Sequence, residues 1–153
     1  MEKFNLKDLS KLSKKLKKKG MKIGLCHGVF DVIHAGHISH FEEVKKKCDF
    51  LFVTVTEDKF VHKGPNRPVN SHYFRAKILE SLKLIDAVGI NYTPDAVDSI
   101  KNIKPNFYFK GRDYQNKKDL TSRLKKEIRA LKKNGGKLIF TESPLKSSTE
   151  IIN

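Results

Sequence analysis

Short apolar runs alternate with amphipathic helical patterns along the chain, and few folds are compatible with that order of elements. Residues 50–56, Phe-Leu-Phe-Val-Thr-Val-Thr, have no regular polar alternation, which is typical of a strand buried on both faces. Further strands are expected at 21–27, 87–92, 107–110 and 138–141, and helices at 6–18, 36–47, 73–82, 95–104 and 120–133. The pattern predicts an α/β protein: a single Rossmann-like three-layer domain with a mostly parallel five-stranded sheet.

Apolar residues at helical spacing indicate which side of each helix faces the core. The expected core positions are Leu6, Leu9, Leu12, Leu16, Ile38, Phe41, Val44, Phe74, Ile78, Leu82, Ala96, Val97 and Ile100. Asn134-Gly135-Gly136 is a C-cap signal that ends the last helix. We interpret residues 1–20 as an amphipathic lead-in helix and 21–153 as the functional domain.

The charge of the chain predicts an anionic partner. The 153 residues include 32 Lys and Arg and 17 Asp and Glu, which gives a formal net charge of +15. Nucleic acid, an acidic membrane surface and phosphorylated small molecules all fit such a charge. The lysine runs within 14–19 and 45–47 flank apolar positions at helical spacing, so we interpret them as solvated helix faces. They lack the interleaved aromatic residues of a nucleic-acid site, which disfavours that partner.

Two cysteines, Cys26 and Cys48, have no metal-ligand spacing and are too few for a disulfide framework. Reduced thiols in a cytoplasmic protein are the simplest interpretation. No apolar run approaches the ~20 residues of a membrane span. The basic N-terminal segment has no apolar h-region behind it, so we do not expect it to be a secretory signal. The end at Asn153 follows what resembles a helix start, so we expect a domain of something longer.

The string 28–37, Gly-Val-Phe-Asp-Val-Ile-His-Ala-Gly-His, lies where the first strand ends and the next helix begins. In a parallel sheet this is a phosphate-binding location, because backbone N–H groups and the positive helix end point at the ligand. His34 and His37 lie on the first turn, where two imidazoles can neutralise a crowded phosphoryl centre. Structural histidines or a metal site are the alternatives, but two His alone make a poor zinc site.

This string resembles the signature of the cytidylyltransferase-like nucleotidyltransferase superfamily. The superfamily includes glycerol-3-phosphate and phosphocholine cytidylyltransferases and the adenylyltransferase domain that activates heptose 1-phosphate. Residues 63–70, Lys-Gly-Pro-Asn-Arg-Pro-Val-Asn, and 110–114, Lys-Gly-Arg-Asp-Tyr, resemble segments of the heptose-phosphate subgroup, although Arg112 stands where that subgroup usually has Gly. Residues 146–151 resemble the second signature, a Ser/Thr-rich helix start that holds triphosphate oxygens.

The resemblance implies a role for each matching residue. His34, His37 and Lys63 are the expected catalytic residues. The expected nucleotide-binding residues are Gly28, Val29, Phe30, Gly36, Arg67, Lys110, Ser147, Ser148 and Thr149. Asp31, Arg75 and Asp113 are expected to bind the second substrate. No catalytic role is expected for Cys26, His27, His40, His62 or His72; for His40 and His72 we expect surface or capping roles.

Several of these residues also have plainer interpretations. Lys63 and Arg67 lie in a loop with Gly and Pro that suits closure over a phosphate, or that is merely solvated. Lys110 follows a strand, at the edge where ligands bind, or is an exposed strand-end lysine. Ser147, Ser148 and Thr149 are also suitable N-caps. Asp31 can bind Mg²⁺ or a hydroxyl, but fixing the loop through backbone hydrogen bonds is the favoured interpretation.

The implied reaction is an in-line attack by an acceptor phosphate on the α-phosphorus of ATP or CTP, with Mg²⁺ bridging the nucleotide phosphates and pyrophosphate leaving. An ionised phosphate needs no base or covalent nucleophile, so positioning and charge stabilisation suffice. The acceptor is expected to be a phosphorylated sugar or polyol for cell-surface glycan synthesis, and the enzyme a homodimer. A glycerol-3-phosphate-type cytidylyltransferase and a non-catalytic nucleotide- or nucleic-acid-binding module remain as alternatives.

Overall fold

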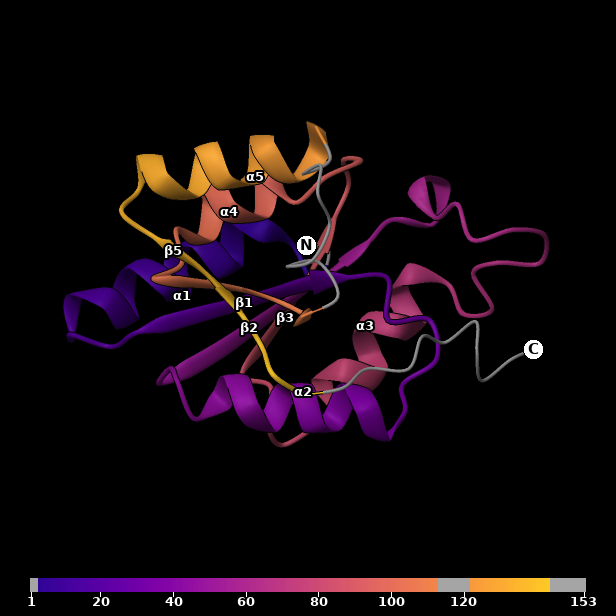
Figure 1. Cartoon of the computed structure of the whole chain (residues 1–153), viewed down its shortest axis with the longest axis horizontal. Coiled ribbons are helices and arrows are strands. Elements are labelled where there is room, and N and C mark those ends of the chain that lie inside the picture. The colour runs from indigo at the N-terminus through magenta and orange to yellow at the C-terminus, as the bar shows by residue number, and fades with distance from the viewer. Residues whose placement is uncertain (1–2, 113–121, 144–153) are drawn as a thin grey trace.

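A computed structural model of the chain describes residues 3–112 and 122–143 (Figure 1). Asp113, Ser147, Ser148 and Thr149 lie outside the described residues.

Five parallel strands form one sheet in the order β3-β2-β1-β4-β5. They are β1 (Ile23–Gly28), β2 (Phe50–Thr56), β3 (Ala87–Asn91), β4 (Phe107–Lys110) and β5 (Lys137–Phe140). The expected α/β class and sheet are confirmed. The strand order reverses at β1, which lies between β2 and β4, so a ligand crevice is expected beyond the carboxyl ends of these strands.

Helices cover both faces of the sheet. One face carries α1 (Leu6–Lys18), α4 (Val97–Ile103) and α5 (Ser122–Lys133), and the other carries α2 (Ala35–Lys45) and α3 (His72–Glu80) (Figure 1). A 3₁₀ turn, η1 (Asp58–Phe60), follows β2. The predicted cap of α5 is present: Gly135 has φ +76°, and its N–H donates to the Lys132 carbonyl at 3.0 Å.

The core face of α3 is not the one that its apolar spacing predicts. Arg75, Ala76 and Leu79 are buried, whereas Phe74 is 57% exposed and Ile78 41%. Arg75 donates three hydrogen bonds inside the domain, and this requirement turns the other side of the helix to the sheet. The expectation for Phe74 and Ile78 was therefore wrong.

Helix α1 packs into the same core as the rest of the domain. Leu12 is exposed, against expectation, because Ser13 takes the inner position and donates to the Ile103 carbonyl at 2.6 Å. The carbonyl of Phe4, just before α1, accepts from the Ile90 N–H at 2.8 Å and so covers the edge of the sheet at β3. Phe4 and the inner side of α1 thus contribute to the packing of the domain that follows.

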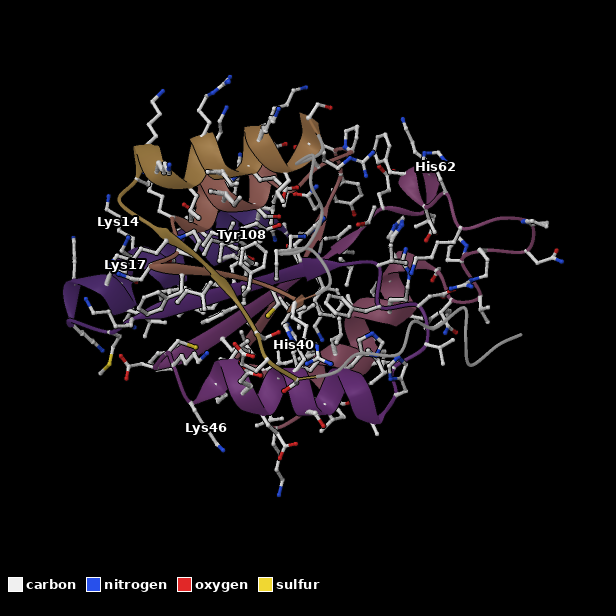
Figure 2. All side chains as sticks on the ribbon, in the orientation of Figure 1. Lys14, Lys17, His40, Lys46, His62 and Tyr108 are labelled. Atoms are coloured by element: carbon white, nitrogen blue, oxygen red, sulfur yellow. The ribbon has the colours of Figure 1, made fainter. Side chains whose placement is uncertain are left out.

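Lysine side chains lie on the outside of both helical layers. Lys14 on α1 is exposed, and Lys46, the C-cap residue of α2, points away from the sheet (Figure 2). The expected solvated faces are confirmed in part, because Lys17 and Lys45 are half-buried and donate to the Lys104 carbonyl and to Asp86. Within 3–112 and 122–143, no helix is long and apolar enough to cross a bilayer.

Candidate active site

His34 and His37 cap helix α2 with their own imidazoles. His34 is the N-cap, with extended backbone, and its Nδ1 accepts a hydrogen bond from the Gly36 N–H at 3.1 Å. His37 Nδ1 accepts from the His34 N–H at 3.2 Å. The two rings thus make a reciprocal capping box, a task that Ser or Thr with Glu usually performs.

These bonds determine the tautomer of both rings. A neutral imidazole whose Nδ1 accepts carries its proton on Nε2, so each ring presents an Nε2–H donor. The His34 Nε2 is buried and has no hydrogen-bond partner among the described residues. Burial, together with the charges of His34, His40 and Lys63, lowers the pKa of His37 to about 4. The ring centroids are 3.9 Å apart, so the pair can donate to neighbouring oxygens of one phosphate chain.

The ring of Phe30 packs against His37 of the histidine pair. It has φ +50°, a left-handed conformation that is uncommon for an aromatic residue. Its ring centroid lies 5.6 Å from that of His37 and 5.6 Å from that of Phe41. A Cβ at Gly28 would lie 3.1 Å from the Phe30 ring, so the glycine leaves space for it. Phe30 and Gly28 thus shape the turn beneath the histidines.

Asp31 holds the 63–70 loop against the histidine turn. Its carboxylate accepts from Arg67 Nε at 2.8 Å, from the Val69 N–H at 2.8 Å and from the Asn70 N–H at 2.9 Å. Burial raises the pKa of Asp31, but these hydrogen bonds outweigh it and leave the pKa below its usual value. The structure supports the interpretation in which Asp31 fixes the loop, and Arg67, expected to hold phosphates, is buried in the same ion pair.

Arg75 occupies a different place from the one expected for a substrate-binding residue. Its side chain is fully buried. The guanidinium donates to the Asn70 carbonyl at 2.9 Å, the Val29 carbonyl at 2.8 Å and Asp58 Oδ1 at 2.6 Å. A buried group with these partners ties the histidine turn to the 63–70 loop. In this structure Arg75 therefore positions the site and does not present its guanidinium to a ligand.

A cavity of about 520 Å³ opens beyond the carboxyl ends of β1, β2 and β4. It brings together four expected site residues, namely Gly28, Val29, Lys63 and Lys110. The other lining residues are His27, Thr56, Pro94, Asp95, Ser122, Arg123, Leu124 and Glu127. Several of these come from α5 and from the loop before α4, which lie on the opposite face of the sheet from α2 (Figure 1).

The cavity combines cations with anchored polar groups. His27 at its floor bonds Thr54 Oγ1 at 2.9 Å and Thr56 Oγ1 at 3.3 Å. Burial, aided by the charges of Lys110 and Arg123, lowers the pKa of His27 to about 3. His27 therefore stays neutral while positive groups surround it. Such a site suits an anionic ligand.

Glu127 supplies a buried carboxylate at the wall of the cavity. It accepts from the Tyr108 hydroxyl at 2.7 Å and from the Ala96 N–H at 2.9 Å.

Sequence reasoning gave His27 no role and did not single out Arg123 or Glu127, because these residues belong to no contiguous motif. A buried-strand histidine and a Glu on the inner side of a very basic helix were the only available signals. His40 is 5% exposed, against the expectation of a surface or capping role, and its Nδ1 lies 3.0 Å from Thr141 Oγ1.

The described residues do not fit a resident Mg²⁺ site. Within 3–112 and 122–143, no group of three or more His, Cys, Asp or Glu side chains could hold a metal. The Asp31 carboxylate already accepts three N–H donors. Mg²⁺ at nucleotide sites is often bound largely through substrate phosphates and water. Mg²⁺ therefore belongs to the nucleotide substrate and not to a site in the described part of the protein.

A parallel sheet with a helix that begins at its switch point is typical of α/β proteins that bind nucleotides. Residues 25–153 match the model of the family described as cytidylyltransferase-like. The chain belongs to this family of nucleotidyltransferases.

Known relatives and structures agree with this assignment. The chain is 35% identical over 129 residues to the bifunctional protein HldE of Nitratiruptor sp., covering 83% of this chain and 28% of the relative. It is 37% identical over 129 residues to the HldE of Campylobacter fetus, covering 83% of this chain and 26% of that protein. The chain thus spans roughly a quarter of the length of these relatives.

Solved structures add two comparisons. A lipopolysaccharide core biosynthesis protein of Thermoplasma volcanium has a TM-score of 0.67 at 26% identity, over 82% of this chain and 99% of that one. A pantoate–β-alanine ligase of Francisella tularensis has a TM-score of 0.59 at 17% identity, over 93% and 66% of the two chains. At that identity, the second structure shows only a shared fold.

Proposed function

We propose that this domain transfers AMP from ATP to a sugar 1-phosphate of the heptose type and releases pyrophosphate. One observation carries the proposal: the paired Nε2–H donors of His34 and His37, with His34 Nε2 buried and unpartnered in the described part of the chain. A buried donor at a helix N-terminus suits an anion that reaches it from outside. The resemblance of 63–70 and 110–114 to heptose-phosphate adenylyltransferases, together with the HldE relatives, supports ATP and a sugar phosphate.

The two substrates would lie on opposite sides of the turn at Gly28 and Val29. The triphosphate would bind at the histidine pair, and the acceptor would occupy the cavity. Lys63 and Lys110, expected from the sequence to be catalytic and nucleotide-binding, line this cavity and would therefore lie with Arg123 around the acceptor phosphate. Attack in line with the leaving pyrophosphate needs such an approach from the far side of the α-phosphorus. The bond from the acceptor oxygen to the α-phosphorus forms as the bond to pyrophosphate breaks. Catalysis is positioning and charge stabilisation.

The test is pyrophosphate release from MgATP and MgCTP against heptose and hexose 1-phosphates, glycerol 3-phosphate and phosphocholine. We expect release from ATP with a sugar 1-phosphate. Release only from CTP with glycerol 3-phosphate would select the cytidylyltransferase alternative. No release, together with steeply salt-dependent binding to RNA or DNA, would select the non-catalytic module.

Assembly and location are also proposals. We propose a cytoplasmic homodimer that acts in the synthesis of cell-surface glycan precursors. The molar mass in solution, measured by light scattering, tests the dimer: a mass of one chain at micromolar concentration would contradict it.

A further inference from the structure

Ten exposed cationic side chains, nine of them lysines, project from the outer sides of α1 and α5. We call them the basic face: Lys7, Lys11, Lys14, Lys15 and Lys18 on α1, and Lys125, Lys126, Arg129, Lys132 and Lys133 on α5. They recur every three or four residues, opposite the buried residues of each helix, so each helix carries one outward stripe of positive charge. Figure 2 shows Lys14 on α1, and side chains that stand out from α5 on the side away from the sheet.

Negative charge is almost missing from these two helices. Asp8 is the exposed carboxylate of α1, and the carboxylate of α5, Glu127, is buried. Among the described residues, none of the ten cations forms an ion pair. The helices on the other side of the sheet differ, because the exposed charged residues of α2 and α3 are Glu42, Lys77 and Glu80. The charge of the domain is therefore asymmetric between the two sides of the sheet.

Helix dipoles account for only part of the basic face. The lysines in the last turn of each helix are favoured by the C-terminal carbonyl groups. The other cations lie earlier in their helices: Lys7, Lys11, Lys14, Lys125, Lys126 and Arg129. Like charges without counter-charges repel one another and destabilise a compact fold. Cations that neither a helix terminus nor a described carboxylate stabilises therefore point to an anionic partner outside the chain.

The arrangement of the two stripes favours a broad, flat partner. Helix α4 packs against both α1 and α5, so it separates the stripes by about two helix–helix distances, roughly 16–20 Å. A flat anionic surface reaches both stripes along their whole length, whereas a nucleic-acid duplex is a rod and reaches both only where it crosses them.

The residue types of the basic face also disfavour nucleic acid. Lysine is a strongly hydrated point charge, whereas readout of bases and phosphates favours the fork of arginine, of which the face has one. Neither α1 nor α5 contains an aromatic residue on which bases could stack. A hydrated layer of lysines suits the headgroups of anionic lipids, which attract clustered basic residues without inserting them.

We propose that the basic face docks this domain on a membrane surface rich in anionic lipids, through electrostatic attraction alone. The cavity opens beyond the carboxyl ends of the strands, at the end of the helical layer and not on its outer side, so docking leaves the candidate active site open. This proposal does not depend on the proposed function.

The test is co-sedimentation with vesicles of equal parts phosphatidylglycerol and phosphatidylcholine at ~0.1 M salt, where charges act over about 10 Å. The parent protein should bind these vesicles and not vesicles of phosphatidylcholine alone. A face variant combines Lys11→Gln, Lys14→Gln and Lys18→Gln and removes three neighbouring charges from α1. Each lysine near an anionic surface contributes about fivefold in affinity, so the face variant should bind about a hundredfold more weakly.

A matched control removes the same charge on or near α2 and α3. It combines Lys46→Gln, Lys77→Gln and Lys83→Gln, which are all exposed. The control and the face variant have the same net charge, but binding of the control should change little, because salt screens charges that lie away from the docked surface. The melting temperature of both variants should stay close to that of the parent protein, since exposed lysines are replaced.

Equal weakening in the two variants would show that only net charge matters and would overturn the proposal. So would a parent protein that does not bind the anionic vesicles, or one that stays bound at ~1 M salt, where charges act over only about 3 Å. Tighter binding to duplex RNA or DNA than to the vesicles, lost in the face variant, would assign the basic face to nucleic acid instead.

Discussion

The end of strand β1 has different surroundings on the two faces of the sheet. Toward α2, the backbone N–H groups of Gly36 and His34 orient the two imidazoles, and Asp31 and Arg75 tie the neighbouring loop in place. Toward α4 and α5, the cavity is lined by charged side chains from several elements, among them Lys110, Arg123 and Glu127. We call these the histidine side and the cavity side.

In the proposed function, the histidine side and the cavity side would recognise their ligands in different ways. Backbone-held groups have few ways to move, so in the proposed function the histidine side would be preorganised for the feature that every reaction of the enzyme shares, the triphosphate. Exposed side chains on the cavity side, such as Arg123, can be replaced with little effect on the fold. The cavity side is therefore where we expect acceptor specificity to be determined.

The largest effect is expected from removing the charge beneath the histidine side. Arg75→Met leaves two backbone carbonyls and Asp58 without their donor, so we expect a loss of ~3–5 kcal/mol in the free energy of unfolding. Urea denaturation measures it. Lys77→Met, on an exposed position of the same helix, should change little. A loss below ~1 kcal/mol for Arg75→Met would show that the histidine side is not held by this network.

The next-largest effect is expected from a variant that still caps α2 but cannot donate a hydrogen bond to a ligand. His34→Asn keeps a good N-cap but removes the Nε2–H donor. We expect kcat/KM to fall by ~10²–10³ with every acceptor alike, with an almost unchanged melting temperature. His62→Asn, on an exposed histidine, serves as the control. A loss that depended strongly on the acceptor would indicate that His34 contacts the acceptor and not the triphosphate.

A smaller and more selective effect is expected on the cavity side. Arg123→Ala removes one cation from the cavity, so the KM for the acceptor should rise by about tenfold or more while the KM for the triphosphate hardly changes. Lys126→Ala, exposed on the same helix, is the matched control. Steady-state kinetics with each substrate varied in turn gives both values. If the triphosphate KM rises instead, the cavity binds the nucleotide.

A further effect on the histidine side is the pH dependence of stability. The pKa of His37 is about 4 in the folded protein, and a histidine in an unfolded chain titrates near ~6.5. Between these values the unfolded chain binds more protons, so the free energy of unfolding should fall as the pH drops from ~6.5 to ~4. His37→Gln should reduce this slope.

The capping geometry also predicts the tautomers of the two rings. Imidazole ¹⁵N shifts will show Nε2–H tautomers for His34 and His37. An Nδ1–H form in either ring would contradict the capping geometry.

Much of the architecture follows from local pattern. The expected ranges 6–18, 50–56 and 107–110 coincide with α1, β2 and β4, because an apolar period of 3.6 residues and a short continuous apolar run can both be recognised without knowledge of distant contacts. The histidine turn was equally readable, since strand, glycine and helix start lie within one contiguous string. Side-chain partners that are far apart in the sequence could not be predicted. Apolar spacing placed Phe74 in the core, whereas the hydrogen bonds of Arg75 determine which face of α3 is buried.

The sequence by itself determined the order of the elements and the position of the histidine turn, because each depends on residues close together in the chain. The parallel sheet then followed from the alternation of strands and helices. Only the tertiary structure decided that Asp31 takes Arg67 as its partner, that His27 and Glu127 line one cavity, and that Glu43 holds Ser143. These pairs come from strands and helices far apart in sequence. Their partners are selected by the packing of both helical layers on the sheet, which no local period encodes.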